Sequence, residues 1–213
     1  MESMSRSERA ALCNTALEAG EKAPTLCGRW TVKDLVIHLL VRERDPLGAP
    51  GIVIPQLERL TDRSARRLAG QDFSTLVERV RSGPPNWSPI AVPPIDRAVN
   101  TLEFFVHHED IRRAAPDWQP RELTEREQKI LWKAIGVAGK GLVRPVGVPV
   151  EIRWPHDERP RSAVLRKGAN PAVVSGTPSE LTLFLFARSQ HGPLELSGPP
   201  EQVRELARGG LSV

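Results

Sequence analysis

WTVKDLVIHLLVRERDP, residues 30–46, has the pattern of a buried helix, and so does NTLEFFVHHEDIRRA, residues 100–114. Thr31 is placed to cap the first helix, with Asp34 at its third position, and Pro46 ends it. The second stretch belongs to a broadly apolar helix from about residue 95 that stops before Pro116. The two stretches predict two helices that each bury one face.

Residues 1–118 read as helical throughout. Ser5 and Glu8 have the spacing of a capping box that opens a helix ending near Gly20. Residues 52–69 predict a third main helix, a short one follows through residues 76–80, and the proline-rich stretch 82–94 is a crossover. Four main helices with one long connection predict a four-helix bundle.

Residues 119–213 have a different periodicity. A helix is expected from Thr124 to about Ala138, followed by strand-like alternation in VGVPVEIRW and RSAVLRK. A further strand in PAVVSG, a helix capped by Thr177, a strand in PLELSG and a closing helix complete the pattern. This order predicts a small α+β unit with a mixed or antiparallel sheet, so the fold class of the chain is α+β.

Composition limits the partners. A hydrophobic fraction of 39% and a charged fraction of 26% are typical of a globular protein. The net charge is +4, the arginines alternate with acids, and there is no Tyr, so no nucleic-acid partner is expected. No apolar run approaches the ~20 residues of a membrane span, and the first residues have no apolar signal core. We therefore expect a cytoplasmic protein without a membrane partner, and Cys13 and Cys27 as reduced thiols.

Three side chains on the two opening stretches have the spacing of a metal site. Glu103 and His107 lie about 40° apart on their helix, whereas His108 points about 140° away from Glu103. His38 lies at the border of the apolar stripe of its own helix and can face the interior. His38, Glu103 and His107 are therefore the candidate ligands of a divalent ion.

The ligand types leave the metal open. Two His and one Glu with an open position suit catalytic Zn²⁺ and also the facial triad of Fe(II) sites. HHEDI is not HExxH, and Glu-x-x-His is absent, so a metalloprotease and a di-iron bundle are not expected. The spacing alone also fits a hydrogen bond between helices or a solvated face.

GRWTVKDLVIHLLVRERDP resembles the first metal-ligand helix of DinB-like bundles, and NTLEFFVHHEDIRRA resembles the second. GTPSELTLFLFAR and PLELSGPPEQV are similar to the small sterol-carrier-like domain of mycothiol-dependent maleylpyruvate isomerases. The likeness covers nearly the whole chain. RERDP and VHHEDIRRA are closer to an uncharacterised actinobacterial branch of that family.

The resemblance implies that His38, Glu103 and His107 bind a divalent ion, most often zinc, with mycothiol as cosubstrate. It implies that an arginine of the C-terminal domain assists at the site, and Arg188 is the match, although Ala187 stands where a Gly often precedes that arginine. A cation at the end of a helix is the other interpretation of Arg188.

The leading hypothesis is a thiol transferase or isomerase that acts on an electrophilic small molecule. Arg42 would hold a carboxylate of the substrate or cofactor, or else pair with neighbouring acids on the surface. Asp110 would orient a ligand, or else form a salt bridge within the N-terminal part.

Cys13 is the residue that would close a tetrahedral site. That closed site favours the alternative, a non-catalytic protein that binds metal or a thiol conjugate; a third hypothesis is an interaction module with a vestigial pocket. Homodimerisation is compatible with each.

The remaining candidates have simpler interpretations. Phe104 and Phe105 are expected in the core, and Trp87 and Trp118 either pack or wall a pocket. His156 and His191 fall in turns and receive no role.

Overall fold

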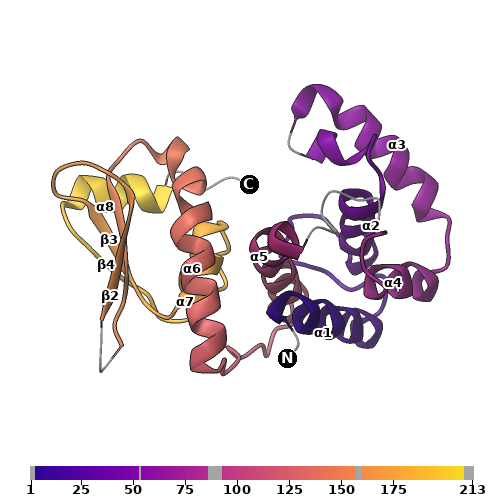
Figure 1. Cartoon of the computed structure of the whole chain (residues 1–213), viewed down its shortest axis with the longest axis horizontal. Coiled ribbons are helices and arrows are strands. Elements are labelled where there is room, and N and C mark those ends of the chain that lie inside the picture. Colours follow the sequence, from indigo (N-terminus) through magenta and orange to yellow (C-terminus); the bar gives the residue numbers. More distant parts are fainter. Residues whose placement is uncertain (1–2, 53, 86–92, 157–159, 209–213) are drawn as a thin grey trace. The chain divides into compact units, whose positions relative to one another are not determined.

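The computed structural model describes residues 3–52, 54–85, 93–156 and 160–208, and for residues 55 and 93–99 it describes the main chain alone. The chain divides into two compact units, Met1–Gln119 and Pro120–Val213. The first unit is helical and the second contains a mixed sheet (Figure 1), so the chain is α+β, as the sequence predicts. Trp87 lies outside the described residues.

In the part of the chain that is described, the N-terminal unit has five α-helices and two short 3-10 turns. They are α1 (Met4–Ala19), α2 (Val32–Arg44), η1 (Ala49–Ile52), η2 (Pro55–Leu57), α3 (Glu58–Ala69), α4 (Phe73–Arg81) and α5 (Pro93–Arg112). α1 packs along α5 and α4, and α2 packs against α3 and α4. The predicted short helix is α4.

All five helices contribute apolar side chains to the N-terminal unit's core. Among those with almost no exposed surface are Leu12 of α1, Leu35 and Leu39 of α2, Leu76 of α4 and Phe104 of α5. Burial of a Leu or Phe side chain is worth about 1.5–3 kcal/mol. This core fixes α2 and α5, and therefore the predicted ligands they carry. Phe105 is also buried, which confirms the expectation for both phenylalanines.

α2 begins and ends as the sequence predicts. The Thr31 side chain accepts a hydrogen bond from the Asp34 amide, and the Asp34 carboxylate accepts one from the Thr31 amide at 2.9 Å. This reciprocal capping box satisfies two amides that the first turn leaves without helical partners. Asp45 caps the C-terminal end, directly before Pro46.

The predicted capping box of α1 is wrong. α1 begins at Met4 after Ser3, and no side chain caps it. The Glu8 carboxylate, which would have closed the box, instead contacts His108 of α5. A long-range partner has therefore replaced a local one.

The predicted third main helix is shorter than expected. It starts at Glu58 rather than at residue 52, because η1 and η2 come first. Gly51 lies so close to Leu57 that an added Cβ would come 2.3 Å from the Leu57 carbonyl oxygen. Only glycine allows this tight approach of the two turns.

The C-terminal unit, as described, is a four-stranded sheet with three α-helices. Its elements are α6 (Glu125–Leu142), η4 (Arg144–Val146), β1 (Val150–Trp154), β2 (Arg161–Arg166), β3 (Ala172–Ser175), α7 (Pro178–Leu185), β4 (Glu195–Ser197) and α8 (Pro200–Arg208). The strand order is β2-β1-β3-β4, with β1 antiparallel to β2 and parallel to β3, and β3 antiparallel to β4. The sheet is therefore mixed. α6 and α7 lie on one side of it (Figure 1).

Helix α7 ends earlier than the predicted SELTLFLFARS segment. Leu185 is its last residue, and Ala187 has a left-handed φ of 59°. A left-handed residue ends a helix because it turns the main chain out of the helical path.

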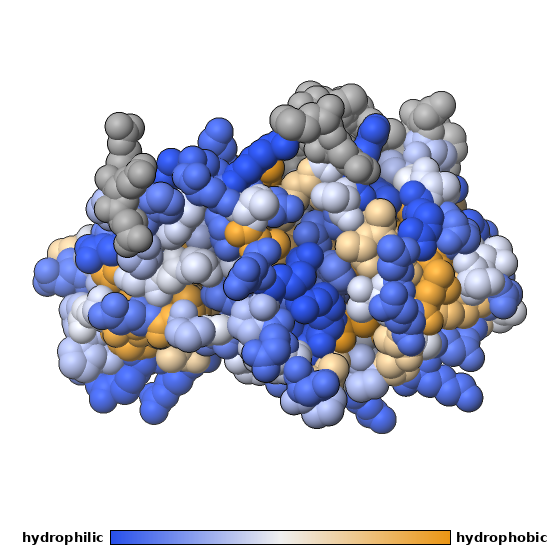
Figure 2. All heavy atoms as spheres, turned by 90° about the horizontal axis from the view of Figure 1, so that it is seen from below, coloured by the Kyte–Doolittle hydropathy of each residue, from blue (hydrophilic) through white to orange (hydrophobic). Residues whose placement is uncertain are grey.

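One face of the molecule is mainly polar. In Figure 2 hydrophilic side chains cover most of the face shown, and the apolar areas between them are small and separate. Large apolar residues with exposed side chains include Trp30, Leu47 and Val137. Scattered apolar side chains of this kind are usual on a protein surface. Among the described helices, none has the length and apolar character needed to cross a membrane.

Candidate metal centre

His38, Glu103 and His107 come together in the N-terminal unit. His38 extends from α2, and the other two residues lie one turn apart on α5. Glu103 Oε1 lies 3.3 Å from His38 Nε2 and 3.2 Å from His107 Nε2. One donor atom from each residue lies within 4.8 Å of the other two. The structure thus places all three predicted ligands around one point.

The separations of these donors fit a bound ion. Ligand bonds of about 2.0–2.1 Å in a tetrahedral zinc site set neighbouring N and O donors about 3.3 Å apart. The two N–O separations here, 3.3 and 3.2 Å, match that value. A direct charged hydrogen bond is shorter, about 2.7–2.9 Å. The three residues are thus spaced as ligands of one divalent ion would be, and without an ion Glu103 contacts both imidazoles as a hydrogen-bond and ion-pair partner.

His107, not His108, faces Glu103. His108 turns towards α1, where its Nδ1 lies 2.9 Å from Glu8 Oε2 and its Nε2 lies 3.0 Å from Thr15 Oγ1. Helical spacing alone predicts this division, because adjacent residues diverge by about 100° around the axis. The His108 side chain therefore contributes to the contact between α1 and α5.

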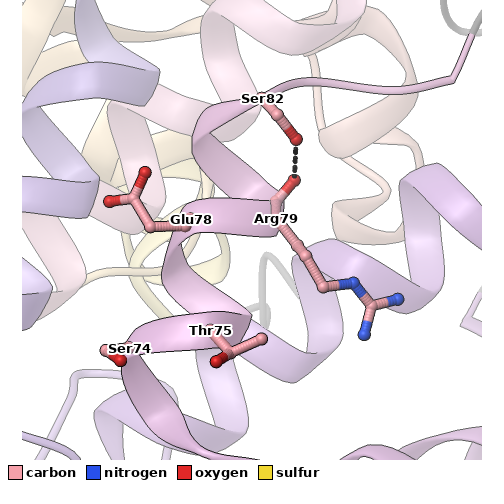
Figure 3. Close-up of a pocket in the computed structure, with 5 residues that line it drawn as sticks. All are labelled: Ser74, Thr75, Glu78, Arg79 and Ser82. Carbon is pink, nitrogen blue, oxygen red and sulfur yellow. Dashed lines mark hydrogen bonds between the residues drawn. The ribbon is translucent and has the colours of Figure 1, made fainter.

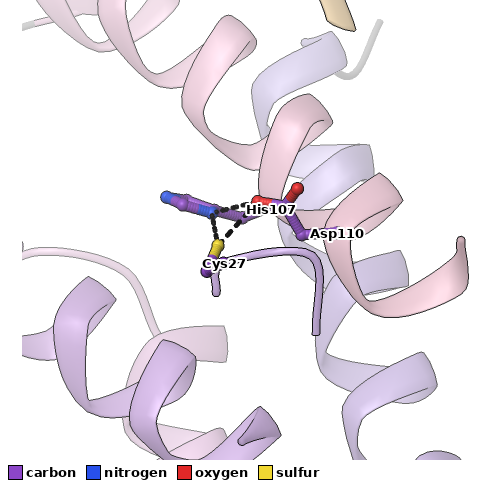
Figure 4. A group of neighbouring side chains, drawn as sticks. All are labelled: Cys27, His107 and Asp110. Atoms are coloured by element: carbon purple, nitrogen blue, oxygen red, sulfur yellow. Dashed lines mark hydrogen bonds and ion pairs between the residues drawn. The ribbon is translucent and has the colours of Figure 1, made fainter. Parts of the chain in front are cut away.

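The other nitrogen of His107 contacts a second group of side chains. Its Nδ1 lies 2.9 Å from Asp110 Oδ2, and the Cys27 thiol donates to the same oxygen at 3.0 Å. Figure 4 shows that Cys27 approaches from the loop before α2, while His107 and Asp110 project from one helix. A proton on Nδ1 leaves the lone pair on Nε2 free for a metal. The contact between Asp110 and His107 is an ion pair within the N-terminal unit and also the contact of an orienting acceptor, so it fits both interpretations of Asp110.

Sequence reasoning missed Cys27. It has no second ligand at a recognised spacing, and its proximity to Asp110 is a contact across 83 positions. The available signal was the position of LCGRWT directly before the helix of His38. Its Gly28 has a φ of 62°, and the Trp30 amide donates to the Cys27 carbonyl at 3.1 Å, closing a tight turn.

Arg42 and Trp30 complete the surroundings of the ligands. Arg42 Nε lies 3.4 Å from Glu103 Oε1, and Nη1 donates to Asn100 Oδ1 at 2.6 Å. Arg42 thus extends from α2 to α5 and does not form the predicted surface pairs along RERD. The Trp30 ring centroid lies 5.1 Å from that of His38, and 39% of Trp30 is exposed. The ligands therefore have a cation and an indole beside them.

Burial and mutual contacts perturb all three candidate ligands. Burial lowers the pKa of His38 below 6.5, which favours the neutral imidazole. Burial opposes ionisation of Glu103, but hydrogen bonds from His107 and His38 outweigh it and hold the pKa of Glu103 well below 4.5. Burial also opposes protonation of His107, yet Asp110, Cys27 and Glu103 raise its pKa well above 6.5. At neutral pH the metal-free centre therefore holds a proton on His107, opposite the Glu103 carboxylate.

Cys13 does not complete this centre. It is fully buried in the core, and its thiol donates to the Val77 carbonyl at 3.6 Å. Burial raises the pKa of Cys13 to about 11. Two groups of described residues could hold an ion, His38–Glu103–His107 and Cys27–His107–Asp110, and Cys13 belongs to neither. The structure therefore does not support Cys13 as the fourth ligand of a closed site.

Arg188 lies in the C-terminal unit, just after α7. Its Nη1 donates to the Phe186 carbonyl at 2.6 Å. This contact fits the interpretation of Arg188 as a cation that satisfies carbonyls at the end of a helix.

The other aromatic and histidine candidates have local contacts. The Arg113 guanidinium lies 4.6 Å from the centroid of the Trp118 ring. His156 lies near Glu125 and Trp154, and His191 packs on Phe184. Within the described part of the chain, none of these residues belongs to a group that could hold a metal ion.

A depression on the surface of α4 is separate from these donors. Ser74, Thr75, Glu78, Arg79 and Ser82 line it (Figure 3). Ser82 Oγ donates to the Arg79 carbonyl, and the Arg79 guanidinium donates to Gln71. Its polar groups are paired within the helical unit, and it contains neither group of metal donors.

Comparison of the whole chain with protein-family models, with curated proteins and with solved structures found no match.

Proposed function

We propose that the helical unit binds a divalent ion through His38, Glu103 and His107, and that this ion is zinc. The observation that carries the proposal is the separation of the donors, 3.2 and 3.3 Å from one carboxylate oxygen to two imidazole nitrogens. A tetrahedral ion with three protein ligands keeps one position for a small molecule, as catalytic zinc sites do.

The charges around the centre favour an anionic small molecule. Glu103 and Asp110 each contribute one negative charge and Arg42 one positive charge, while the two histidines bind metal as neutral rings. With a divalent ion the group has a net charge of one positive unit. The position left by the protein ligands therefore suits a thiolate or another anion.

We further propose that the anion is a low-molecular-weight thiol, mycothiol, as the resemblance to mycothiol-dependent isomerases implies. A bound zinc ion lowers the pKa of a coordinated thiol, so that thiolate is available near neutral pH. The chain would then act as a transferase or isomerase on an electrophilic small molecule. His38, Glu103 and His107 hold the ion, and Asp110 fixes the orientation of His107.

Arg42 has a second task in this proposal. Its guanidinium lies 3.4 Å from Glu103 Oε1 and adds to the hydrogen bonds from His107 and His38 that favour the ionised carboxylate. Its charge beside the ligands also favours an anionic partner. An arginine of the C-terminal domain assists at the site in the family that the chain resembles. Arg188 is the residue that matches it, and the proposed role of Arg188 rests on that resemblance alone.

Metal analysis after purification without chelators tests the proposal. We expect close to one equivalent of zinc in the wild-type chain and a large loss in His38→Ala, Glu103→Ala and His107→Ala. The matched control is His108→Ala, which removes an adjacent imidazole and should retain the ion. A wild-type chain that binds neither zinc nor cobalt would refute it.

Catalysis and simple binding are separated by a second measurement. Zinc-loaded protein is incubated with mycothiol and a panel of small electrophiles, and the consumption of thiol is compared with that of the metal-free protein. Zinc-dependent consumption supports the enzyme. Saturable binding of mycothiol without consumption supports the alternative, a protein that carries metal or a thiol conjugate.

A further inference from the structure

Cys27 contacts the residue that orients one of the proposed metal ligands. Its Sγ lies 3.0 Å from Asp110 Oδ2, the same oxygen that lies 2.9 Å from His107 Nδ1. The Asp110 side chain is completely buried. A buried carboxylate depends on its donors, because the loss of one leaves charge without compensation.

The separations indicate hydrogen bonds rather than a second ion. Zinc would hold sulfur about 3.5 Å from a neighbouring oxygen, and nitrogen about 3.3 Å from it. The observed values, 3.0 and 2.9 Å, are both shorter. Cys27 Sγ is 3.8 Å from His107 Nδ1, so both groups approach the carboxylate more closely than they approach each other. Asp110 is thus a common acceptor for two donors.

The loop around Cys27 is fixed to Asp110 at a second point. The Leu26 amide donates to the Asp110 main-chain carbonyl at 3.0 Å. The Cys27 amide donates to Thr25 Oγ1 at 3.2 Å, and Thr25 Oγ1 donates to the carbonyl of Trp30, on the far side of the turn, at 2.9 Å. These hydrogen bonds fix the main chain on both sides of Cys27, and with it the position from which the thiol extends.

We propose that Cys27 is a positioning residue of the metal centre. Its thiol proton holds Asp110 Oδ2 where the carboxylate accepts the Nδ1 proton of His107. His107 Nε2 then stays directed towards the position beside Glu103 Oε1 that the ion would occupy. Cys27 touches neither the ion nor a substrate in this role. The inference rests on the proposed metal binding.

Zinc affinity, measured by competition with a chromophoric chelator, tests the role of Cys27. Cys27→Val removes the donated proton at similar volume and should weaken zinc binding by up to roughly tenfold, the lower end of the cost of losing a direct partner of a ligand, because Cys27 acts through Asp110. Cys27→Ser supplies a hydroxyl donor and should restore most of the affinity. The matched control is Cys13→Val, which removes the thiol buried in the core of the same unit and should leave zinc affinity unchanged.

A second readout is independent of the ion. In metal-free protein, nitrogen-15 NMR should show the Nδ1 proton of His107 as a downfield resonance that exchanges slowly with water. Cys27→Val should accelerate that exchange, and Cys27→Ser should not. If the wild type binds no zinc, the proposed function fails, and this exchange rate still decides whether Cys27 orders His107.

Two results would overturn the inference. Wild-type zinc affinity in Cys27→Val would show that the thiol does not position a ligand. Equal loss in Cys27→Ser and Cys27→Val would show that sulfur, rather than its donated proton, is required.

Discussion

The imidazole rings of His38 and His107 meet edge to face, with centroids 5.2 Å apart and planes inclined by 71°. They come from α2 and α5, helices that have η1, η2, α3 and α4 between them in the sequence. Both rings direct Nε2 to one oxygen of Glu103. An ion held there would link two helices that lie far apart in the sequence.

Zinc should therefore stabilise the folded chain. An ion that binds only the native state at 100 times its Kd adds about 2.7 kcal/mol to the free energy of unfolding. We expect this gain in urea denaturation of wild-type protein with added zinc, and its disappearance with excess chelator. His38→Ala should show no gain. An equal gain in that variant would place the stabilising ion elsewhere.

Variants of His107 and of His108 should separate an effect on zinc binding from an effect on the stability of the fold. His108→Ala leaves the buried Glu8 carboxylate without its imidazole partner, which costs about 1–3 kcal/mol or more. Chemical denaturation of the metal-free protein measures this loss. Zinc affinity should stay near the wild-type value, whereas His107→Ala should abolish it. Loss of zinc in His108→Ala with normal binding in His107→Ala would show that the helix faces are assigned wrongly.

Zinc binding should release a proton at neutral pH. The contacts of His107 with Asp110, Cys27 and Glu103 raise its pKa well above 6.5, so an imidazolium must lose its proton before Nε2 can bind an ion. Zinc affinity should rise with pH up to that pKa and level off above it. Calorimetry in two buffers of different ionisation enthalpy counts the protons. No release at pH 6.5 would contradict this protonation state.

The stability of the metal-free protein should fall at high pH, whereas zinc affinity should rise. A pKa of His107 that is raised on folding stabilises the chain fully below 6.5, and the gain is lost as pH rises through the folded value. The lowered pKa of Glu103 contributes above 4.5 and is lost as pH falls through its folded value. Thermal melts across this range should show both limits. Glu103→Gln should weaken both.

Arg42 should affect anion binding more than metal binding. Arg42→Gln removes a positive charge beside Glu103, so zinc should be retained while a thiol or carboxylate binds more weakly, roughly tenfold for about 1.4 kcal/mol. Isothermal titration of the zinc-loaded protein with a small thiol measures this. The control is Arg44→Gln, because Arg44 donates to Ser82 and Gly83 of the α4 end. Equal weakening in both variants would assign the effect to general surface charge.

Local patterns were sufficient for the ligand helices. The Thr31–Asp34 capping box and Pro46 determine where α2 begins and ends, because each acts within one turn of the chain. The spacing of Glu103 and His107 determines which imidazole shares a face with the carboxylate, since helical periodicity needs no tertiary information.

The tertiary structure alone decided which partner each polar group takes. Glu8 has the spacing of a local cap but contacts His108, and Arg42 leaves its charged neighbours for Glu103 and Asn100. Cys27 reaches Asp110 across 83 positions. A side chain in a folded unit contacts whichever group the packing of the helices brings near it. The separation of two residues in the sequence does not predict which groups those are.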